Sequence, residues 1–137
     1  DRLIDISPQN AGHYIDRGVI RHGIDPTGAL DDYSAALDIQ DHPLARNNRA
    51  VLLAEQGEYT KAIQDAERTL ELDATHTIAY ATLAEIYAQM HETEAFYKYL
   101  ELAVRHYYDD VLELLETPAF QPYMDEPTFQ SMLKRTI

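Results

Sequence analysis

A long stretch that contains almost no helix-breaking residue constrains this chain most. Between Pro43 and Pro118 there is no proline, and Gly57 is the only glycine. β-Branched residues do not cluster there, and apolar positions do not alternate as they do in a half-buried strand. Instead, apolar residues recur at helical spacing, most clearly in the stripe of Tyr80, Leu83, Ala84, Tyr87 and Ala88. We therefore expect an all-α fold.

Helix starts and ends are marked in the sequence. Ser7-Pro8 and Asp25-Pro26 each place a capping side chain before a proline in the first turn. Gly23 and Gly57 follow apolar-periodic stretches, where a left-handed residue closes a helix. These signals predict helices near residues 9–22, 26–39, 43–56, 59–72, 76–90, 93–107, 109–116 and 127–135. The first six are similar in length and joined by short turns, which indicates three antiparallel hairpins.

The hairpins also repeat in sequence. Sliding the chain along itself aligns Ala50 with Ala84, and a shift shorter by one position aligns Ala29 with Ala62. A helical hairpin repeated about every 34 residues is typical of tetratricopeptide arrays. The spacing therefore indicates a stack of repeated hairpins.

Three motifs carry a resemblance to the tetratricopeptide repeat family. They are the first-helix set Tyr80, Ala84 and Tyr87, the second-helix set Ala29, Tyr33 and Ala36, and the tripeptide Asn48-Arg49-Ala50. The resemblance implies a right-handed α-solenoid of antiparallel helical hairpins. In such a fold the small residues Gly18, Ala50 and Ala84 would mark close helix crossings. The chain departs from the pattern at Arg21 and Arg46, which stand where large apolar residues are expected.

The resemblance predicts a division of the chain. Residues 1–8 would be the remnant of a preceding repeat helix, and residues 108–137 a capping segment. The repeats would cover residues 9–41, 42–75 and 76–107. Because the first residue is not methionine, we expect a piece of a longer protein with more repeats upstream. The cap would cover the last hairpin with Leu112, Leu115, Phe120, Phe129 and Leu133.

The residue types needed for catalysis or metal binding are scarce or wrongly spaced. The chain has no cysteine, which excludes disulfides and thiolate zinc sites. Its six histidines form no metal-binding pair, and the polar run from His91 to Glu94 is expected at an inter-helix turn. Asp31-Asp32 and Asp109-Asp110 are expected on solvated helix faces or as charges at a helix start. We expect neither an enzyme, nor a metal site, nor a cofactor.

Charge and hydropathy narrow the range of partners. The chain has 24 acidic and 11 basic residues and a net charge of −13. This excess is spread along the chain and argues against nucleic acid or an anionic membrane surface as a partner. The apolar runs are too short for a transmembrane helix. Nothing in the sequence identifies a compartment, and a cytoplasmic location is the expectation if the parent protein has no leader.

The resemblance implies a binding groove lined by the first helices of successive hairpins. Its predicted residues are Ile15, Asp16, Val19, His22, Leu44, Asn47, Asn48, Val51, Glu55, Ile78, Ala81, Thr82 and Glu85. This surface mixes apolar, amide and acidic side chains. The basic residues of a carboxylate clamp are missing, since those places hold Ile15, Val19, Ile78 and Thr82. We therefore do not expect a clamp for acidic C-terminal tails.

These residues suggest a protein-binding scaffold, although the same residues could simply solvate one face. The expected partner is a protein or peptide with apolar anchors and basic character. An alternative is a structural or self-association module within a larger repeat protein, acting through its N-terminal edge.

Overall fold

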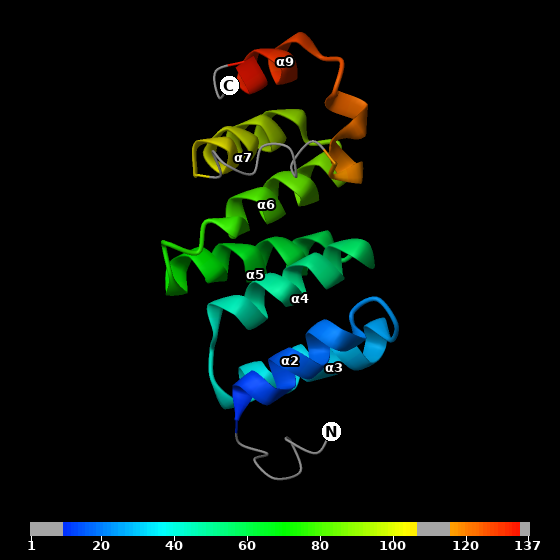
Figure 1. The fold of residues 1–137 in the computed structure, drawn as a ribbon, viewed down its shortest axis with the longest axis vertical. Helices are drawn as coiled ribbons and strands as arrows, with labels where there is room; N and C mark the ends of the chain where they lie inside the picture. Colours follow the sequence, from blue (N-terminus) through cyan, green and yellow to red (C-terminus); the bar gives the residue numbers. More distant parts are fainter. Residues whose placement is uncertain (1–9, 107–115, 135–137) are drawn as a thin grey trace. The chain divides into compact units, whose positions relative to one another are not determined.

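A computed structural model describes residues 10–106 and 116–134, and its regular elements in these ranges are all helices. The chain divides into two compact units, Asp1–His76 and Thr77–Ile137. The first contains α2 (Ala11–Arg21), α3 (Pro26–Ile39), α4 (Pro43–Glu55) and α5 (Tyr59–Leu72) (Figure 1). The second contains α6 (Ile78–Gln89), α7 (Thr93–His106), the 3-10 helix η2 (Pro118–Tyr123) and α9 (Pro127–Lys134). The all-α prediction is confirmed.

Local sequence signals account for most helix bounds. The predicted ranges 26–39 and 59–72 match α3 and α5 at both ends. Asp25 caps α3, since its carboxylate accepts a hydrogen bond from the Gly28 amide at 3.0 Å. The predicted helix 109–116 lies almost entirely outside the described residues, as do the Ser7-Pro8 signal and the remnant 1–8.

Helix α6 begins later than the sequence predicts, at Ile78 rather than residue 76. The Asp73 carboxylate accepts hydrogen bonds from both the backbone amide and the hydroxyl of Thr75, at 2.9 and 2.5 Å. The Asp73 side chain thus gives the Thr75 amide a hydrogen-bond partner outside a helix, and the helix begins later in the chain.

The first unit consists of two helical hairpins that share a core. Helix α2 packs against α3, α4 packs against α5, and α4 also contacts α3 and α2. Buried Ala29, Tyr33 and Leu52 join α3 to α4. A second cluster, formed by Ala11, Ile15, Ala36 and Ala45, joins α2, α3 and α4. Small residues recur in both clusters because helices approach closely only where side chains are short.

The second unit is organised around Phe96 on α7. The ring centroid of Phe96 lies 5.4 Å from that of Phe120, 4.1 Å from that of Tyr123 and 6.4 Å from that of Phe129. These three aromatic residues come from η2 and α9, so the C-terminal segment completes the core of the α6–α7 hairpin. Phe120 and Phe129 thus cover this hairpin as predicted. Leu112, Leu115 and the Leu133 side chain lie outside the described residues. The predicted repeat limits stay a prediction.

The turns within the hairpins differ from the prediction at one glycine. Gly57 has a left-handed φ of +80° as predicted, but Gly23 does not, so its predicted role is wrong. The chain from Gly18 to Ala29 is shorter by one position than that from Ala50 to Ala62. The shorter connection closes through hydrogen bonds from the Ile24 and Asp25 amides to the Arg21 carbonyl, without a left-handed residue.

Candidate functional site

The part of the predicted groove in the first unit lies on α2 and α4, which contact each other. The structure brings seven predicted residues onto these helices and their ends with side chains that are exposed or half-buried. They are Asp16, Val19, His22, Leu44, Asn48, Val51 and Glu55. Val19 is 54% exposed and Leu44 is 40% exposed, which is high for large apolar residues. We call these seven residues the α2–α4 face.

Three predicted groove residues are buried and offer no exposed side chain to a ligand. Ile15 belongs to the core cluster that joins α2, α3 and α4. Asn47 is 4% exposed, and its Oδ1 atom is buried without a hydrogen-bond partner. Thr82 is buried, and its hydroxyl donates to the Ile78 carbonyl at 3.3 Å. The expectation that these side chains face a groove is therefore corrected: they belong to the interior.

The remaining predicted residues lie on α6 and belong to the second unit. Ile78 is 45% exposed, whereas Ala81 and Glu85 are half-buried. The structure thus brings the predicted residues together in two separate groups, one on each unit.

A contact between His22 and Glu55 connects the C-terminal ends of α2 and α4. His22 Nε2 lies 3.0 Å from Glu55 Oε2, and His22 Nδ1 lies 3.4 Å from the Tyr33 hydroxyl. Burial raises the pKa of Tyr33 above its ordinary value, and the charges of Asp32 and Glu55 raise it further. Both His22 and Glu55 were predicted as site residues, but only the structure shows that they contact each other.

Beneath this surface, a buried carboxylate holds the first hairpin together. Asp32 on α3 is 2% exposed. It accepts hydrogen bonds from Arg17 Nε at 3.1 and 3.0 Å and from Arg17 Nη2 at 2.7 Å. Arg21 Nη1 lies 3.3 Å from the same carboxylate. The prediction that Asp32 lies on a solvated face is therefore wrong, whereas its neighbour Asp31 is exposed. Asp109-Asp110 lies outside the described residues.

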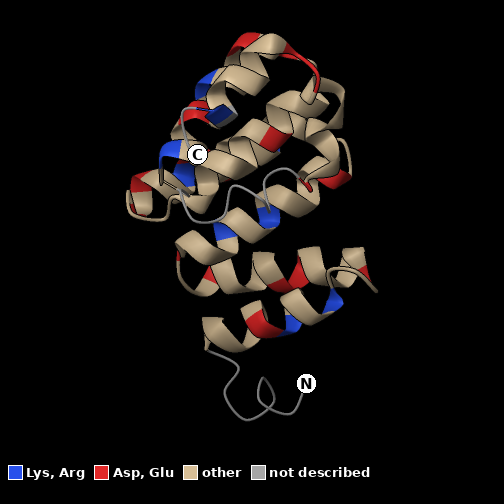
Figure 2. Ribbon diagram, turned by 45° about the horizontal axis from the view of Figure 1, so that its top comes forward, with Lys and Arg blue, Asp and Glu red and all other residues tan. Residues whose placement is uncertain are grey.

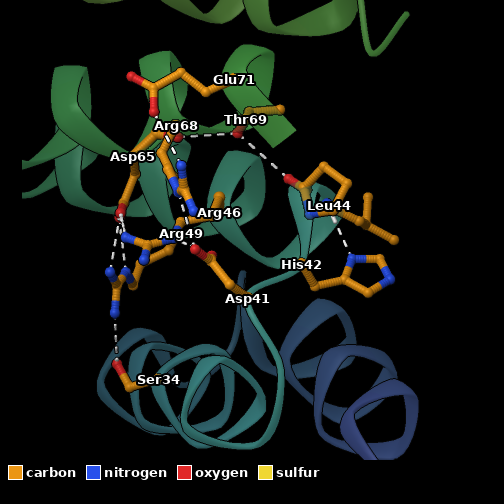
Figure 3. Close-up of polar contacts among 11 residues, drawn as sticks. Ser34, Asp41, His42, Leu44, Arg46, Arg49, Asp65, Arg68, Thr69 and Glu71 are labelled. Atoms are coloured by element: carbon orange, nitrogen blue, oxygen red, sulfur yellow. Dashed lines mark hydrogen bonds and ion pairs between the residues drawn. The ribbon is translucent and has the colours of Figure 1, made fainter. Parts of the chain in front are cut away.

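The second hairpin has a similar network, in which Asp65 matches Asp32 and Arg49 matches Arg17 in the repeat, whereas the second arginine, Arg46, stands at a different position from Arg21. Asp65 on α5 is 3% exposed and accepts hydrogen bonds from Arg46 Nη1 at 2.8 Å and from Arg49 Nε and Nη2 at 2.7 and 2.9 Å. Figure 3 shows both arginines converging on this carboxylate. Asp41 extends the network, since it accepts from Arg46 Nε at 2.7 Å and from Arg68 Nε at 2.9 Å. Hydrogen bonding by Arg46, with a further contribution from Arg68, holds the pKa of Asp41 below its ordinary value.

The third hairpin replaces the ion pair with aromatic stacking. Tyr99 occupies the position that corresponds to Asp65, and its ring stacks on Tyr87 with centroids 5.6 Å apart and an interplanar angle of 3°.

The sequence contained a signal for the ion pairs of the first two hairpins. Arg21 and Arg46 stand out as departures from the apolar pattern, and each shares its hairpin with a second arginine and an aspartate, Asp32 or Asp65. This association shows why arginine is tolerated at these half-buried positions in place of an apolar residue.

Charged residues occur on both units (Figure 2). In the described parts of the chain, no group of three histidine, cysteine or acidic residues is arranged to hold a metal ion. Over the same residues, none of the helices combines the length and the apolar character that crossing a membrane requires.

Two exposed apolar residues were missed by the sequence analysis: Ile20 on α2 is 68% exposed, and Ile24 in the following turn is 84% exposed.

Comparison with known proteins gives a likeness of fold among the solved structures. Neither the protein-family models nor the curated proteins include a match. Among solved structures, the chain is similar to the crystal structure of MamA, with a TM-score of 0.77 and 15% sequence identity. The match covers 98% of this chain and 81% of MamA, which contains tetratricopeptide repeats. This chain therefore has the tetratricopeptide-type fold, an α-solenoid of antiparallel helical hairpins.

Proposed function

We propose that the chain is a protein-interaction scaffold whose α2–α4 face binds a peptide segment of a partner protein. The exposure of Val19 and Leu44 carries the proposal, because two large apolar side chains are presented to solvent on adjacent helices of one unit. Helices of this kind form grooves that bind short segments through apolar anchors. The tetratricopeptide-type fold supports the proposal, since it presents helix surfaces of this kind.

The charged residues of this surface favour a basic partner. Asp16 and Glu55 are exposed on α2 and α4, and the chain as a whole carries a net charge of −13. Opposite charge accelerates association through steering, and added salt screens that attraction. A ligand with lysine or arginine beside apolar anchors would therefore match both features of the surface.

Polar contacts would orient the bound segment. The half-buried Asn48 carries both a donor and an acceptor, as a peptide backbone does. The contact between His22 and Glu55 holds the ends of the two helices together, so less side-chain freedom is lost on binding. We infer a binding role for this surface, because Asn48 and the contact between His22 and Glu55 suit the orientation of a bound segment.

Selection from a displayed library of random peptides tests the proposal. We expect enriched peptides to combine Leu, Ile or Val with Lys or Arg, and to associate more slowly as sodium chloride is raised. The double variant Asn48→Ala, Val51→Arg should lose binding while its helical circular dichroism and melting stay unchanged. Thr60→Arg, which adds the same charge at an exposed position on α5, should bind like the parent chain.

Two results would count against the proposal. If the selected peptides bind the double variant as well as they bind the parent chain, recognition does not use the α2–α4 face. If the library yields no binder and light scattering shows that the chain associates with itself, the alternative of a self-association module is favoured instead.

A further inference from the structure

We propose that the first unit has a second binding site, a cavity that binds a carboxylate or phosphate group carried on a small organic molecule. The cavity lies among α3, α4 and α5 and has a volume of about 300 Å³. It is lined by Leu30, Ser34, Arg46, Arg49, Leu53, Lys61, Gln64 and Asp65. None of these residues belongs to the predicted groove, so the two sites can be tested separately.

The charge of the cavity is opposite to that of the chain. Three of its lining residues are cationic, Arg46, Arg49 and Lys61, and one is anionic, Asp65. Asp65 is already satisfied by three N–H donors from the two arginines, so it does not compete for a ligand's place. The chain as a whole repels anions, because its net charge is −13. An anion would therefore be attracted only close to a cluster of cationic side chains such as this one.

Several hydrogen-bond donors around the cavity are still available. Within the described residues, Lys61 and Gln64 make no hydrogen bond or ion pair to the protein. Arg49 Nη1 reaches only the Ser34 hydroxyl, at a long 3.4 Å (Figure 3). Guanidinium and ammonium groups with unused N–H donors are the groups that proteins use to hold carboxylates and phosphates.

The walls of the cavity are held in place before a ligand arrives. Asp65 fixes both arginines, and Asp41 further fixes Arg46 with a hydrogen bond of 2.7 Å. The two arginines would therefore lose little side-chain entropy on binding. Leu30 and Leu53 provide apolar surface for the carbon skeleton of the ligand, and the volume is at the small end of the range for ligand sites.

Titration of the ¹⁵N-labelled chain, followed by NMR, tests the inference with two probes, glutarate and glycerol 3-phosphate. We expect saturable shifts of the amides of α3, α4 and α5 around the cavity with at least one of them. The two titrations show whether a carboxylate or a phosphate is preferred. Neutral glutaramide, and sodium chloride at matched ionic strength, should produce no such saturable shifts.

Variants at exposed lysines make the test specific. Lys61→Ala should weaken binding about tenfold, the loss expected for one hydrogen bond to a charged group. Lys134→Ala removes the same charge from α9 in the second unit and should leave the affinity unchanged. Because Lys61 is exposed and makes no ion pair with the described residues, its replacement should leave melting unchanged. Absence of saturable shifts with both probes, or equal affinity of Lys61→Ala and the parent chain, would overturn the inference.

Discussion

Gly18 on α2 lies directly against the ring of Tyr33 on α3. A β-carbon at position 18 would be 2.6 Å from Tyr33 Cε1 and 2.9 Å from Cδ1, closer than real β-carbons approach. Tyr33 is 1% exposed, so its ring has no free space to move into. The small residue predicted at this crossing is thus required by the tyrosine of the facing helix.

Gly18→Ala should therefore destabilise the first unit even though alanine favours helix. Overpacking costs about 1–3 kcal/mol, which exceeds the gain of about 1 kcal/mol in helix propensity. Urea unfolding monitored by circular dichroism measures the difference. Gly23→Ala is the control, because a β-carbon there meets nothing within 4 Å and its φ is not left-handed. A stability of Gly18→Ala equal to or above that of Gly23→Ala would contradict this account.

His91 has a left-handed backbone conformation, and replacing it with glycine should make the protein more stable. Its φ is 60°, and it has the same place in its hairpin as Gly57, whose φ is 80°. A side chain in this conformation costs about 1 kcal/mol, so His91→Gly should raise the free energy of unfolding by about that amount. Gly57→Ala should lower it by a similar amount, because a β-carbon at Gly57 meets nothing and only the backbone conformation matters. Thermal melts of both variants check the prediction, which fails if His91→Gly melts below the parent chain.

The buried ion pair of the second hairpin should be far more important than an exposed one. Arg49→Ala leaves the buried Asp65 carboxylate with Arg46 alone and should cost about 3 kcal/mol. Arg105→Ala breaks an exposed pair with Glu101 on α7 and should cost less than about 1 kcal/mol. Chemical denaturation of both variants makes the comparison. Similar losses for the two would show that the buried pair contributes no more to stability than an exposed one.

Acid should weaken the connection between α4 and α5 through Asp41. The pKa of Asp41 is lowered from its ordinary value of 3.8, mainly by the hydrogen bond from Arg46 and additionally by Arg68. A lowered pKa means that the stabilisation is fully present above pH 3.8 and is lost as the pH falls through the lowered value. Asp41→Asn should therefore melt below the parent chain at about pH 6, with a smaller difference at about pH 2.5. A difference that does not change with pH would exclude an electrostatic role for Asp41.

Removing an aromatic ring from the C-terminal segment should destabilise the second unit. Phe129 is 1% exposed and lies in the cluster around Phe96. Phe129→Ala should cost about 3–5 kcal/mol and expose apolar surface of α7. Melting and size-exclusion chromatography measure the loss of stability and any association. An unchanged melting curve would show that α9 is dispensable for this core.

The helices of the fold could be predicted from the sequence because their signals are local. Proline, capping side chains and the spacing of apolar residues act within a few positions of each helix end. Asp25 caps the start of α3, and Gly57 takes a left-handed conformation just after α4, as their residue types predict. Gly18 likewise stands at a close crossing, as expected from its place in the repeat.

The rotation of each helix about its own axis decides which of its side chains are exposed. This rotation depends on the neighbouring helices, so the sequence could not show which predicted groove residues reach the surface. Asn47 and Asn48 are adjacent and chemically identical, yet Asn47 is buried and Asn48 is half-exposed. The burial of Ile15 is likewise set by contacts from other helices, at Ala36 and Ala45.

The positions of the helices and of the small residues that allow them to pack follow from the sequence, since these depend on local backbone preferences and side-chain size. The partners of the charged residues, in contrast, become visible only in the folded chain. Asp32 and Asp65 look like surface residues in the sequence, but arginines from the preceding helix of each hairpin satisfy them in the interior. A carboxylate is stable in the interior only when enough donors converge on it, and that convergence requires the folded arrangement of two helices.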